Sequence, residues 1–535
     1  MRIRGALNES AFTGADSDGR LCLLCTVAIL KIVRNLRAVD MNENVLTHLV
    51  GSLPTTFDPA TACDSSSQTA IQNIYETLVA YDGGQVRAVV PQLAESWQAS
   101  VDSRRFVFKL RSGVRFHNGR PLDATAVVYS LRRAIRMNQG SAWILAQCLA
   151  EDGLQMVDGL TIEMNLTRPF PGFLYCLANT VASIVEPTTV EMNSNLILGQ
   201  ENAWLADHVI GTGPFMLGEW KPERELSLLR NDRYWREPAR IAEAHVFLEH
   251  DETEQKRRLL QGQADLTTIS SLEAWRLKSH PGIDVVRGQG LDREMIGLNC
   301  RVPPFNDARV RQAVAYAIDY ESLLATESGY PFVRTDGPIP AQIEGHDDNL
   351  CLYNRDLDKS RQLLHAADYV NGFHTTLALN EGFLPRRRIA DVVAQSLRTV
   401  SIKVTIEVLS WSDFSKRLNQ RTLDMFAWNW VPDYPDPDCY VYPLYHSQSL
   451  ANQAGYSSAA MNSLLDTARV ESDPVRRFDL YRKVQRRALQ DAPYLFMVQG
   501  PDLIAYRNCV GGLVYNPLTQ TGDPVYFYPL YKRAG

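Results

Sequence analysis

The sequence predicts an α/β protein with more than one lobe. In its second half, an apolar helical stripe over residues 389–400 runs directly into strict apolar–polar alternation over residues 402–408. A helix followed at once by a half-buried strand is typical of α/β construction. The chain has 535 residues, which is too long for one ordinary hydrophobic core, so we expect two or three lobes.

The composition is that of a globular protein and argues against two classes of partner. Hydrophobic residues make up 45% of the chain and charged residues 22%. Lysine and arginine number 55 against 61 acids, which gives a formal net charge of −6. Without a basic excess, we expect no binding to nucleic acid or to an anionic membrane surface.

The first 44 residues do not resemble the rest. Residues 21–30 (LCLLCTVAIL) form an apolar run of signal-peptide length that is too short to span a bilayer comfortably. Asp16 and Asp18 stand where a signal peptide is normally basic, and no small-residue cleavage site follows. We interpret residues 1–44 as an N-terminal extension with a degenerate export segment. The alternative is an extension without any role in export.

The cysteines indicate neither a disulfide framework nor a metal site. Nine is an odd number, and the spacings after Cys25 are wide. Cys22 and Cys25 have C-x-x-C spacing, but they lie inside the apolar run and no second pair exists. We therefore expect no metal and no cofactor.

In the first half, regular elements begin at Val45, where a short strand is predicted. Apolar residues at helical spacing then predict a helix with Ile71, Ile74, Tyr75 and Leu78 on one face. Alternation predicts strands over residues 106–110 and 160–166. Asp123 is a suitable N-cap for the helix between these strands.

In the second half, Asp307 is expected to cap a helix, and another helix is expected to begin at Trp411. A strand is predicted from Leu423 to Trp430. Asp473 and Pro474 form a cap-plus-proline start for the last long helix. Residues 494–498 are the final predicted strand.

The segment from Trp428 to Asp438 (WNWVPDYPDPD) combines aromatic rings, acids and prolines. Proline fixes φ and removes a backbone donor, so this segment predicts a stiff loop rather than a regular helix or a central strand. Loops held by a rigid scaffold often carry function. The alternative is an aromatic-rich turn whose acids face water, and Asp436 and Asp438 are interpreted as such solvated acids.

No catalytic arrangement stands out. The chain contains no G-x-S-x-G, no H-E-x-x-H and no zinc-spaced group of Cys and His. The acidic loop lacks the glycine and the terminal glutamate of an EF-hand. We therefore assign no catalytic and no metal residue, and we do not expect an enzyme.

From about Val45 onward the chain resembles the family 5 extracellular solute-binding proteins of ABC importers, the oligopeptide and dipeptide binders. The resemblance covers nearly all of the chain except its first 44 residues. The matching segments stand in family order: GSLPTTFDPA, IYETLVAYD, VPQLAESW, FVFKLRSGVRFHNGRPLDATAVVYSL, IGTGPF with LGEW, RNDRYW, GLNC, PPFNDARVRQAVAYAID, SIKVTIEVLSW, WVPDYPDPD and DAPYLF.

The resemblance implies a periplasmic-binding-protein-like fold, with two α/β lobes joined by a hinge and an additional domain inserted in the first lobe. It implies the following division after residues 1–44: lobe I in 45–88 and 205–295, the inserted subdomain in 89–204, lobe II in 296–504, and a return to lobe I in 505–535.

The function implied is that of a monomeric, non-enzymatic periplasmic receptor. It would capture a small peptide or peptide-like ligand between closing lobes and deliver it to the permease subunits of an ABC transporter. One alternative is the same fold binding a non-peptide nutrient such as an opine, an oligosaccharide or a metal chelate. A carboxylate-based hydrolase is the other.

The resemblance also implies the binding residues. Asp433 matches the family aspartate that pairs with a peptide's α-ammonium, Trp411 matches an aromatic lining the pocket, and Glu76 and Thr77 match the edge of the first lobe that faces it. Trp430 and Tyr434 flank Asp433 and are expected to shape the cavity. Core packing is the alternative for Trp411 and Trp430.

The partner of the ligand's carboxylate is not evident. Some oligopeptide binders carry a basic residue about six positions before the amine-binding aspartate, and here that position is Ala427. Either Arg387, Arg388 or another side chain substitutes, or the ligand has no carboxylate at that place.

We predict that residues 1–50, fused to a reporter that is active only outside the cytoplasm, will give little or no reporter activity. The apolar run can engage an export machine, but its acidic flank and missing cleavage site make export inefficient. A fusion carrying an established signal peptide is the control. Robust activity from residues 1–50 would contradict the prediction.

Overall fold

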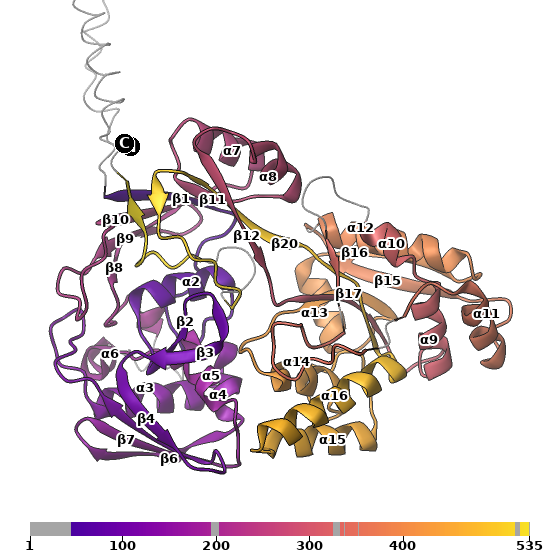
Figure 1. The fold of residues 1–535 in the computed structure, drawn as a ribbon, viewed down its shortest axis with the longest axis horizontal. Coiled ribbons are helices and arrows are strands. Elements are labelled where there is room, and N and C mark those ends of the chain that lie inside the picture. The colour runs from indigo at the N-terminus through magenta and orange to yellow at the C-terminus, as the bar shows by residue number, and fades with distance from the viewer. Residues whose placement is uncertain are drawn as a thin grey trace, which may run out of the picture.

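The computed structural model describes residues 44–193, 203–324, 332–335, 337–350, 353–382, 384–518 and 525–533. Figure 1 shows two lobes side by side, with β12 (Ile283–Gln289) and β20 (Pro501–Arg507) lying between them. Residues 1–43 of the predicted export segment lie outside the described part. Among the helices of the described residues, none is long and apolar enough to cross a membrane.

The first lobe is built on a seven-stranded mixed sheet. Its central strand, β1, pairs in parallel with both β10 and β11. Parallel neighbours need crossover connections, which are supplied by long excursions of the chain. The strands, in sheet order, are β12, β20, β11 (Leu266–Thr268), β1 (Val45–Val50), β10 (Glu243–Leu248), β9 (Glu225–Arg230) and β8 (Phe215–Lys221). Helices α2 (Ser65–Ile74), α7 (Glu252–Leu260) and α8 (Ser271–Leu277) belong to the same lobe.

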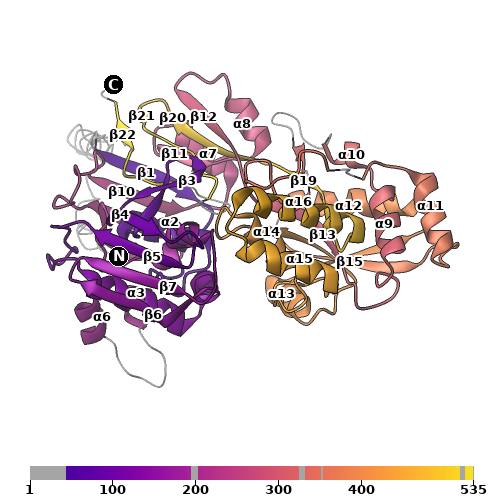
Figure 2. The same ribbon diagram turned by 60° about the horizontal axis from the view of Figure 1, so that its bottom comes forward.

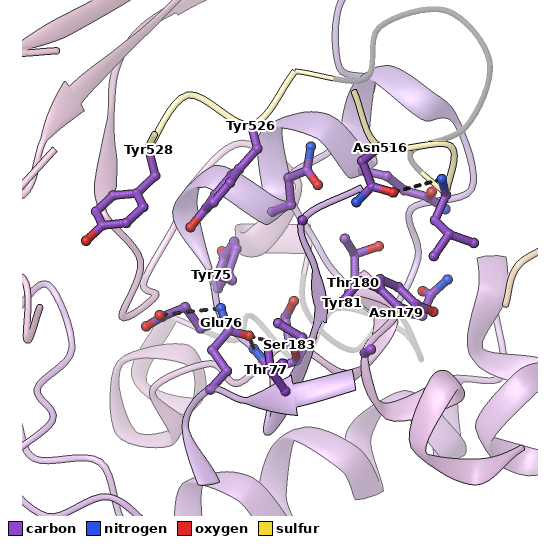
Figure 3. A pocket seen from close by; sticks show the side chains of 18 of the residues that line it. Tyr75, Glu76, Thr77, Tyr81, Asn179, Thr180, Ser183, Asn516, Tyr526 and Tyr528 are labelled. Atoms are coloured by element: carbon purple, nitrogen blue, oxygen red, sulfur yellow. Dashed lines mark hydrogen bonds between the residues drawn. The ribbon is translucent and has the colours of Figure 1, made fainter. Parts of the chain in front are cut away.

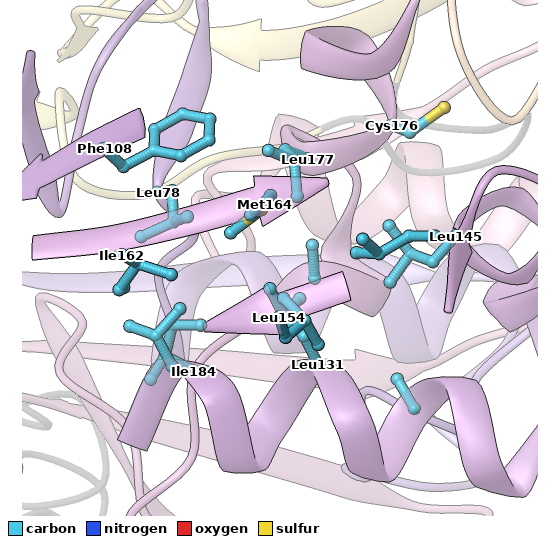
Figure 4. Packing of buried hydrophobic residues seen from close by; sticks show 14 of the residues in the cluster. Leu78, Phe108, Leu131, Leu145, Leu154, Ile162, Met164, Cys176, Leu177 and Ile184 are labelled. Atoms are coloured by element: carbon cyan, nitrogen blue, oxygen red, sulfur yellow. The ribbon is translucent and has the colours of Figure 1, made fainter. Parts of the chain in front are cut away.

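A separate four-stranded antiparallel sheet is formed by the chain between β1 and β8. Its strands, in order, are β4 (Ala94–Ala99), β5 (Arg105–Leu110), β7 (Thr161–Leu166) and β6 (Leu149–Asp158). The predicted alternation is confirmed, because Phe106, Phe108 and Leu110 are buried in one cluster. Figure 4 shows the packing of this cluster, with Leu131 of α3 (Ala124–Met137) beneath the strands. Asp123 caps α3 as predicted, since its carboxylate accepts a bond from the Ala126 N–H.

Shorter elements complete this part of the chain and the C-terminal tail. They are the hairpin β2 (Val79–Asp82) and β3 (Gln85–Pro91), the helices α4 (Trp143–Ala146), α5 (Phe173–Leu177) and α6 (Pro187–Asn193), the 3₁₀ turns η2 (Gly140–Ala142), η3 (Thr180–Ala182) and η4 (Ala203–Ala206), and the pair β21 (Val510–Gly511) and β22 (Tyr531–Lys532).

The second lobe is built on a five-stranded sheet. In order, its strands are β16 (Lys403–Leu409), β15 (His374–Asn380), β17 (Met425–Trp430), β13 (Arg293–Leu298) and β18 (Tyr494–Phe496). The predicted final strand is interrupted at Met497, and β19 (Val498–Gln499) pairs with β14 (Val333–Arg334) instead. The helices are α9 (Ala308–Ala317), α10 (Tyr320–Leu324), α11 (Leu357–Ala366), α12 (Leu384–Arg398), α13 (Trp411–Asn419), α14 (Pro437–Tyr445), α15 (Ala459–Val470) and α16 (Pro474–Asp491).

The chain passes between the two large sheets twice. β12 pairs with β20 in antiparallel register up to Gln289 and Pro501. Beyond that pair, residues 290–292 lead into β13, and residue 500 joins β19 to β20. These crossings lie close to the predicted lobe boundaries at 295/296 and 504/505, which stay predictions.

The predicted helix around Ile71 is shorter than expected. It ends at Ile74, Tyr75 is already extended, and Leu78 belongs to the core of the four-stranded sheet. A close approach of the chain fixes this end, because the Gly213 N–H donates to the Ile74 carbonyl oxygen at 2.9 Å. A Cβ on Gly213 would stand 2.5 Å from that oxygen, so no larger residue fits there.

The acidic loop after β17 corrects the interpretation of Asp436 and Asp438, which are buried rather than solvated. Asp436 caps α14, and Pro437 occupies the first helical turn, where a missing N–H costs nothing. Asp436 also binds Arg477 in a two-pronged pair, with distances of 2.7 and 2.9 Å, and both side chains are at most 4% exposed. Arg469 donates to Asp438 at 3.1 Å. Figure 2 shows α15 and α16, which carry these arginines, beside α14.

We predict that Asp436→Asn and Asp438→Asn will each lower the free energy of unfolding by about 3–5 kcal/mol, because each leaves an arginine buried without its counter-charge. Asp479→Asn is the control, since that acid pairs with Lys483 on the exposed face of α16 and should matter little. Urea denaturation measures all three. Equal small effects would mean that the loop acids are solvated.

Candidate ligand-binding site

A cavity of about 410 Å³ lies against the first lobe and reaches Asp433 of the second. Its walls come from α2, from the β2–β3 hairpin with the residues before it, from the segment around η3 and from the C-terminal tail. Figure 3 shows the cavity with Tyr526 and Tyr528 on one side and Asn179 and Thr180 on the other. Among its lining residues are Ser65, Gln68, Thr69, Gln72, Tyr75, Glu76, Thr77, Tyr81, Asn179, Ser183, Arg236, Asp433, Asn516, Tyr526 and Tyr528.

Helix α2 turns a polar stripe toward the cavity. Ser65, Gln68, Thr69 and Gln72 follow the i, i+3, i+4, i+7 spacing of one helical face. The Nε2 atoms of Gln68 and Gln72 are buried without a hydrogen-bond partner among the described residues. The opposite face, with Ile71, packs into the core of the first lobe. The helix therefore offers unused amide donors to whatever fills the cavity.

Glu76 is buried in the cavity wall and already has its partners. Its carboxylate accepts bonds at 2.8 Å from the Thr212 hydroxyl, the Tyr234 hydroxyl and the Trp235 indole N–H. Burial raises the pKa of Glu76, and these bonds together with the charge of Arg236 oppose that rise. The carboxylate is held in place and fixes the wall around it.

Thr77 continues the same edge. Its hydroxyl lies 2.6 Å from the Val79 carbonyl oxygen and 3.0 Å from the Gln92 amide oxygen. Like Glu76, this side chain is buried and lines the cavity, so the two predicted edge residues do lie together.

Asp433 is the one residue of the second lobe that lines the cavity in the described chain. Its carboxylate accepts a bond from the Ser141 hydroxyl at 2.9 Å, and its carbonyl oxygen accepts one from the Asn179 amide at 2.8 Å. Burial raises the pKa of Asp433 to about 6, although bonds from Ser141 and Trp143 oppose this. Among the described residues, no basic side chain forms an ion pair with Asp433. The carboxylate is therefore a partly buried charge without a counter-charge.

The loop around Asp433 packs tightly against the first lobe. A Cβ on Gly172 would stand 2.9 Å from an Asp436 oxygen. The segment around Gly172 can therefore approach the acidic loop this closely because residue 172 is glycine. Ser141, which donates to Asp433, follows Gly140, and Gly140 packs closely against the carbonyl oxygens of Thr61 and Ala62, just before α2. Asp433 thus faces the N-terminal end of α2.

The three aromatic residues of the predicted site lie in different surroundings. Trp411 begins α13 and is 59% exposed, which rules out core packing, and it is not among the cavity-lining residues. Trp430 is buried in the second lobe and donates its indole N–H to the Cys439 carbonyl oxygen at 2.8 Å. Tyr434 is fully buried and packs with Phe170 in the core of the four-stranded sheet. Their predicted roles toward a ligand stay predictions.

The expected partner for a ligand carboxylate does not come from the predicted positions. Ala427 is buried in the core of the second lobe, where its strand pairs with β13. Arg387 pairs with Asp391 on the exposed face of α12, and neither it nor Arg388 lines the cavity. The basic residue that does line it is Arg236, which the sequence did not single out.

Comparison with known proteins places this geometry in context. Residues 88–452 match the family sequence model described as bacterial extracellular solute-binding proteins, family 5 Middle. The probable D,D-dipeptide-binding periplasmic protein DdpA of Escherichia coli is 28% identical over 87% of this chain and 90% of its own length. Heme-binding protein A of Haemophilus influenzae is 25% identical over 91% of this chain and 93% of its own length. The Helicobacter pylori periplasmic binding protein DppA, solved in complex with the peptide STSA, has a TM-score of 0.80 and 28% identity, covering 92% of this chain and 100% of that one.

These matches agree with the two-lobed architecture and extend over most of both chains. The family consists of solute-binding proteins of ABC transporters rather than enzymes, so the hydrolase alternative is rejected. The chain belongs to the bacterial extracellular solute-binding proteins of family 5.

Proposed function

We propose that this protein is the substrate-binding component of an ABC importer, and that it captures short peptides between its two lobes and delivers them to the permease subunits in the membrane. Two relatives support this ligand class. DdpA of Escherichia coli is described as a probable D,D-dipeptide-binding protein, and DppA of Helicobacter pylori was solved in complex with the peptide STSA. We further propose that the protein works as a monomer in the periplasm, with the division into lobes given above.

The uncompensated carboxylate of Asp433 carries this proposal. A partly buried acid with hydroxyl and indole donors but no cation is poorly neutralised, and burial penalises its charge. The α-ammonium of a peptide would supply the missing positive charge. Closure of the lobes around it would remove water and strengthen the pair.

The polar walls suit a peptide backbone. The stripe of Ser65, Gln68, Thr69 and Gln72 and the amide of Asn516 can meet main-chain groups directly or through water without selecting particular side chains. In this proposal Glu76 and Thr77 hold the first-lobe edge in shape. Trp430 and Tyr434 brace the Asp433 loop and so shape the cavity. Trp411, which is exposed on the second lobe, lines the ligand site when the lobes close.

A non-peptide nutrient is the alternative ligand. Heme-binding protein A is among the relatives, so the family name alone does not fix the ligand class. Mass spectrometry of small molecules released by denaturing freshly purified protein distinguishes the two. We expect short peptides. Recovery of an opine, an oligosaccharide or a metal chelate would replace the peptide assignment but not the solute-binding role.

We predict that Asp433→Asn will weaken the binding of a recovered peptide about 100- to 3,000-fold, which corresponds to the loss of about 3–5 kcal/mol when a buried charge loses its partner. The free protein should remain as stable as wild type or become more stable, because a raised pKa means that the buried charge costs stability above pH 6. Calorimetry and thermal melting measure the two quantities.

Asp82→Asn is the matched control, since Asp82 lines the same cavity but is exposed. In wild type, affinity should also fall as pH drops through about 6, where Asp433 takes up a proton and can no longer pair with an ammonium. This pH dependence should vanish in Asp433→Asn. Similar losses for Asp433→Asn and Asp82→Asn would contradict the assigned role.

We also predict that a recovered peptide will compact the protein and raise its melting temperature. A ligand that binds between lobes favours the closed form, and mass action stabilises the folded chain. Small-angle scattering with and without peptide measures the radius of gyration. An unchanged radius despite calorimetric binding would exclude closure of the lobes.

A further inference from the structure

We infer that Arg236 receives the free carboxylate of the bound peptide, so that the cavity binds both ends of a ligand of about four residues. This inference rests on the proposed function and adds the residue that the sequence could not supply. Its basis is the position of one cation in a cavity whose only second-lobe charge, among the described residues, is an acid.

Arg236 is a cation without a fixed anionic partner. Its guanidinium stacks on the Trp235 ring, 4.4 Å from the centroid, and among the described residues no ion pair or hydrogen bond holds it. It is exposed, lines the cavity, and acts on Glu76 through its charge. Glu76 itself is already bonded to three donors, so the guanidinium can still bind a further anion.

The two charges stand at opposite ends of α2. Asp433 accepts a bond from Ser141, and the neighbouring Gly140 packs closely against the carbonyl oxygens of Thr61 and Ala62, just before the helix. Arg236 stacks on Trp235, whose indole N–H donates to Glu76, just after the helix. The helix has 10 residues, so it is about 15 Å long. An extended peptide spans about 3.3–3.6 Å per residue, so a peptide of four residues, about 13–14 Å long, covers most of the distance between the two ends of the helix.

The face of α2 between Asp433 and Arg236 also favours a peptide that lies along the helix. Gln68 and Gln72 are one helical turn apart and direct buried, unpartnered amide donors at the cavity. Buried donors without partners are costly, and peptide carbonyl groups are acceptors that would satisfy them. A ligand lying along α2 would therefore place its ammonium at Asp433, its carbonyls over the two glutamines and its carboxylate at Arg236.

The competing explanation is that Arg236 only offsets the charge of Glu76. The test begins with a pool of tri- and tetrapeptides built from Ala, Ser, Leu and Met, offered to the full chain. Peptides retained after ultrafiltration are identified by mass spectrometry. The best-retained peptide is then titrated by calorimetry as the free acid, as the C-terminal amide and as the N-acetyl derivative.

Wild type should bind the free acid about 10-fold more tightly than the amide, the lower end of what a hydrogen bond between charged groups contributes, because Arg236 is exposed. Arg236→Gln should lose this preference by weakening only the free acid, and Arg236→Lys should keep part of it. Arg240→Gln is the matched control: Arg240 also stacks on an aromatic ring and is exposed, but it does not line the cavity. It should behave as wild type.

Two results would overturn the inference. One is equal binding of acid and amide by wild type, and the other is an equal loss for both in Arg236→Gln, which would assign Arg236 to Glu76. The N-acetyl derivative reports separately on Asp433 and should bind weakly to every variant. If no peptide of the pool is retained in any form, the peptide assignment fails together with this inference.

Discussion

Asp433, Asp436 and Asp438 follow β17 in one short stretch. The partners of these three carboxylates determine how the loop is held between the two lobes. Two of them are neutralised by arginines from α15 and α16, which fixes the loop to the second lobe. The third crosses to the first lobe and meets hydroxyl, amide and indole groups there, but no cation among the described residues. Closing the lobes without a positive ligand is therefore opposed by the desolvation of one carboxylate.

The first lobe presents mainly uncharged polar side chains to the Asp433 carboxylate. Its cavity wall consists mainly of amides, hydroxyls and tyrosines, and its buried acid, Glu76, is fully engaged by Thr212, Tyr234 and Trp235. Under the proposed function, such a wall suits the backbone of many peptides, because backbone groups are common to all of them. Discrimination would then be left to the groups that bind the charged ends of the ligand.

Local features could be predicted from the sequence, and long-range pairing could not. The caps Asp123, Asp307 and Asp473 act on N–H groups two or three residues away, so a short window of sequence contains all that decides them. Asp436 was misread because its partner, Arg477, is 41 positions away. The motif resemblance located Asp433, but Arg236 sits among several arginines that look alike in sequence, and only the folded chain brings it to the cavity.

The two crossings between the sheets limit how the lobes can move. They leave neighbouring ends of one antiparallel ladder, after Gln289 and before Pro501, and both contain a glycine, Gly290 and Gly500. Two short tethers that lie side by side permit rotation about an axis close to them but resist twisting or sliding. We therefore expect the two lobes to open by a hinge rotation about one axis close to the tethers. Under the proposed function, Asp433 would return to the same place near the N-terminal end of α2 at each closure, so successive ligands would be held with the same polarity.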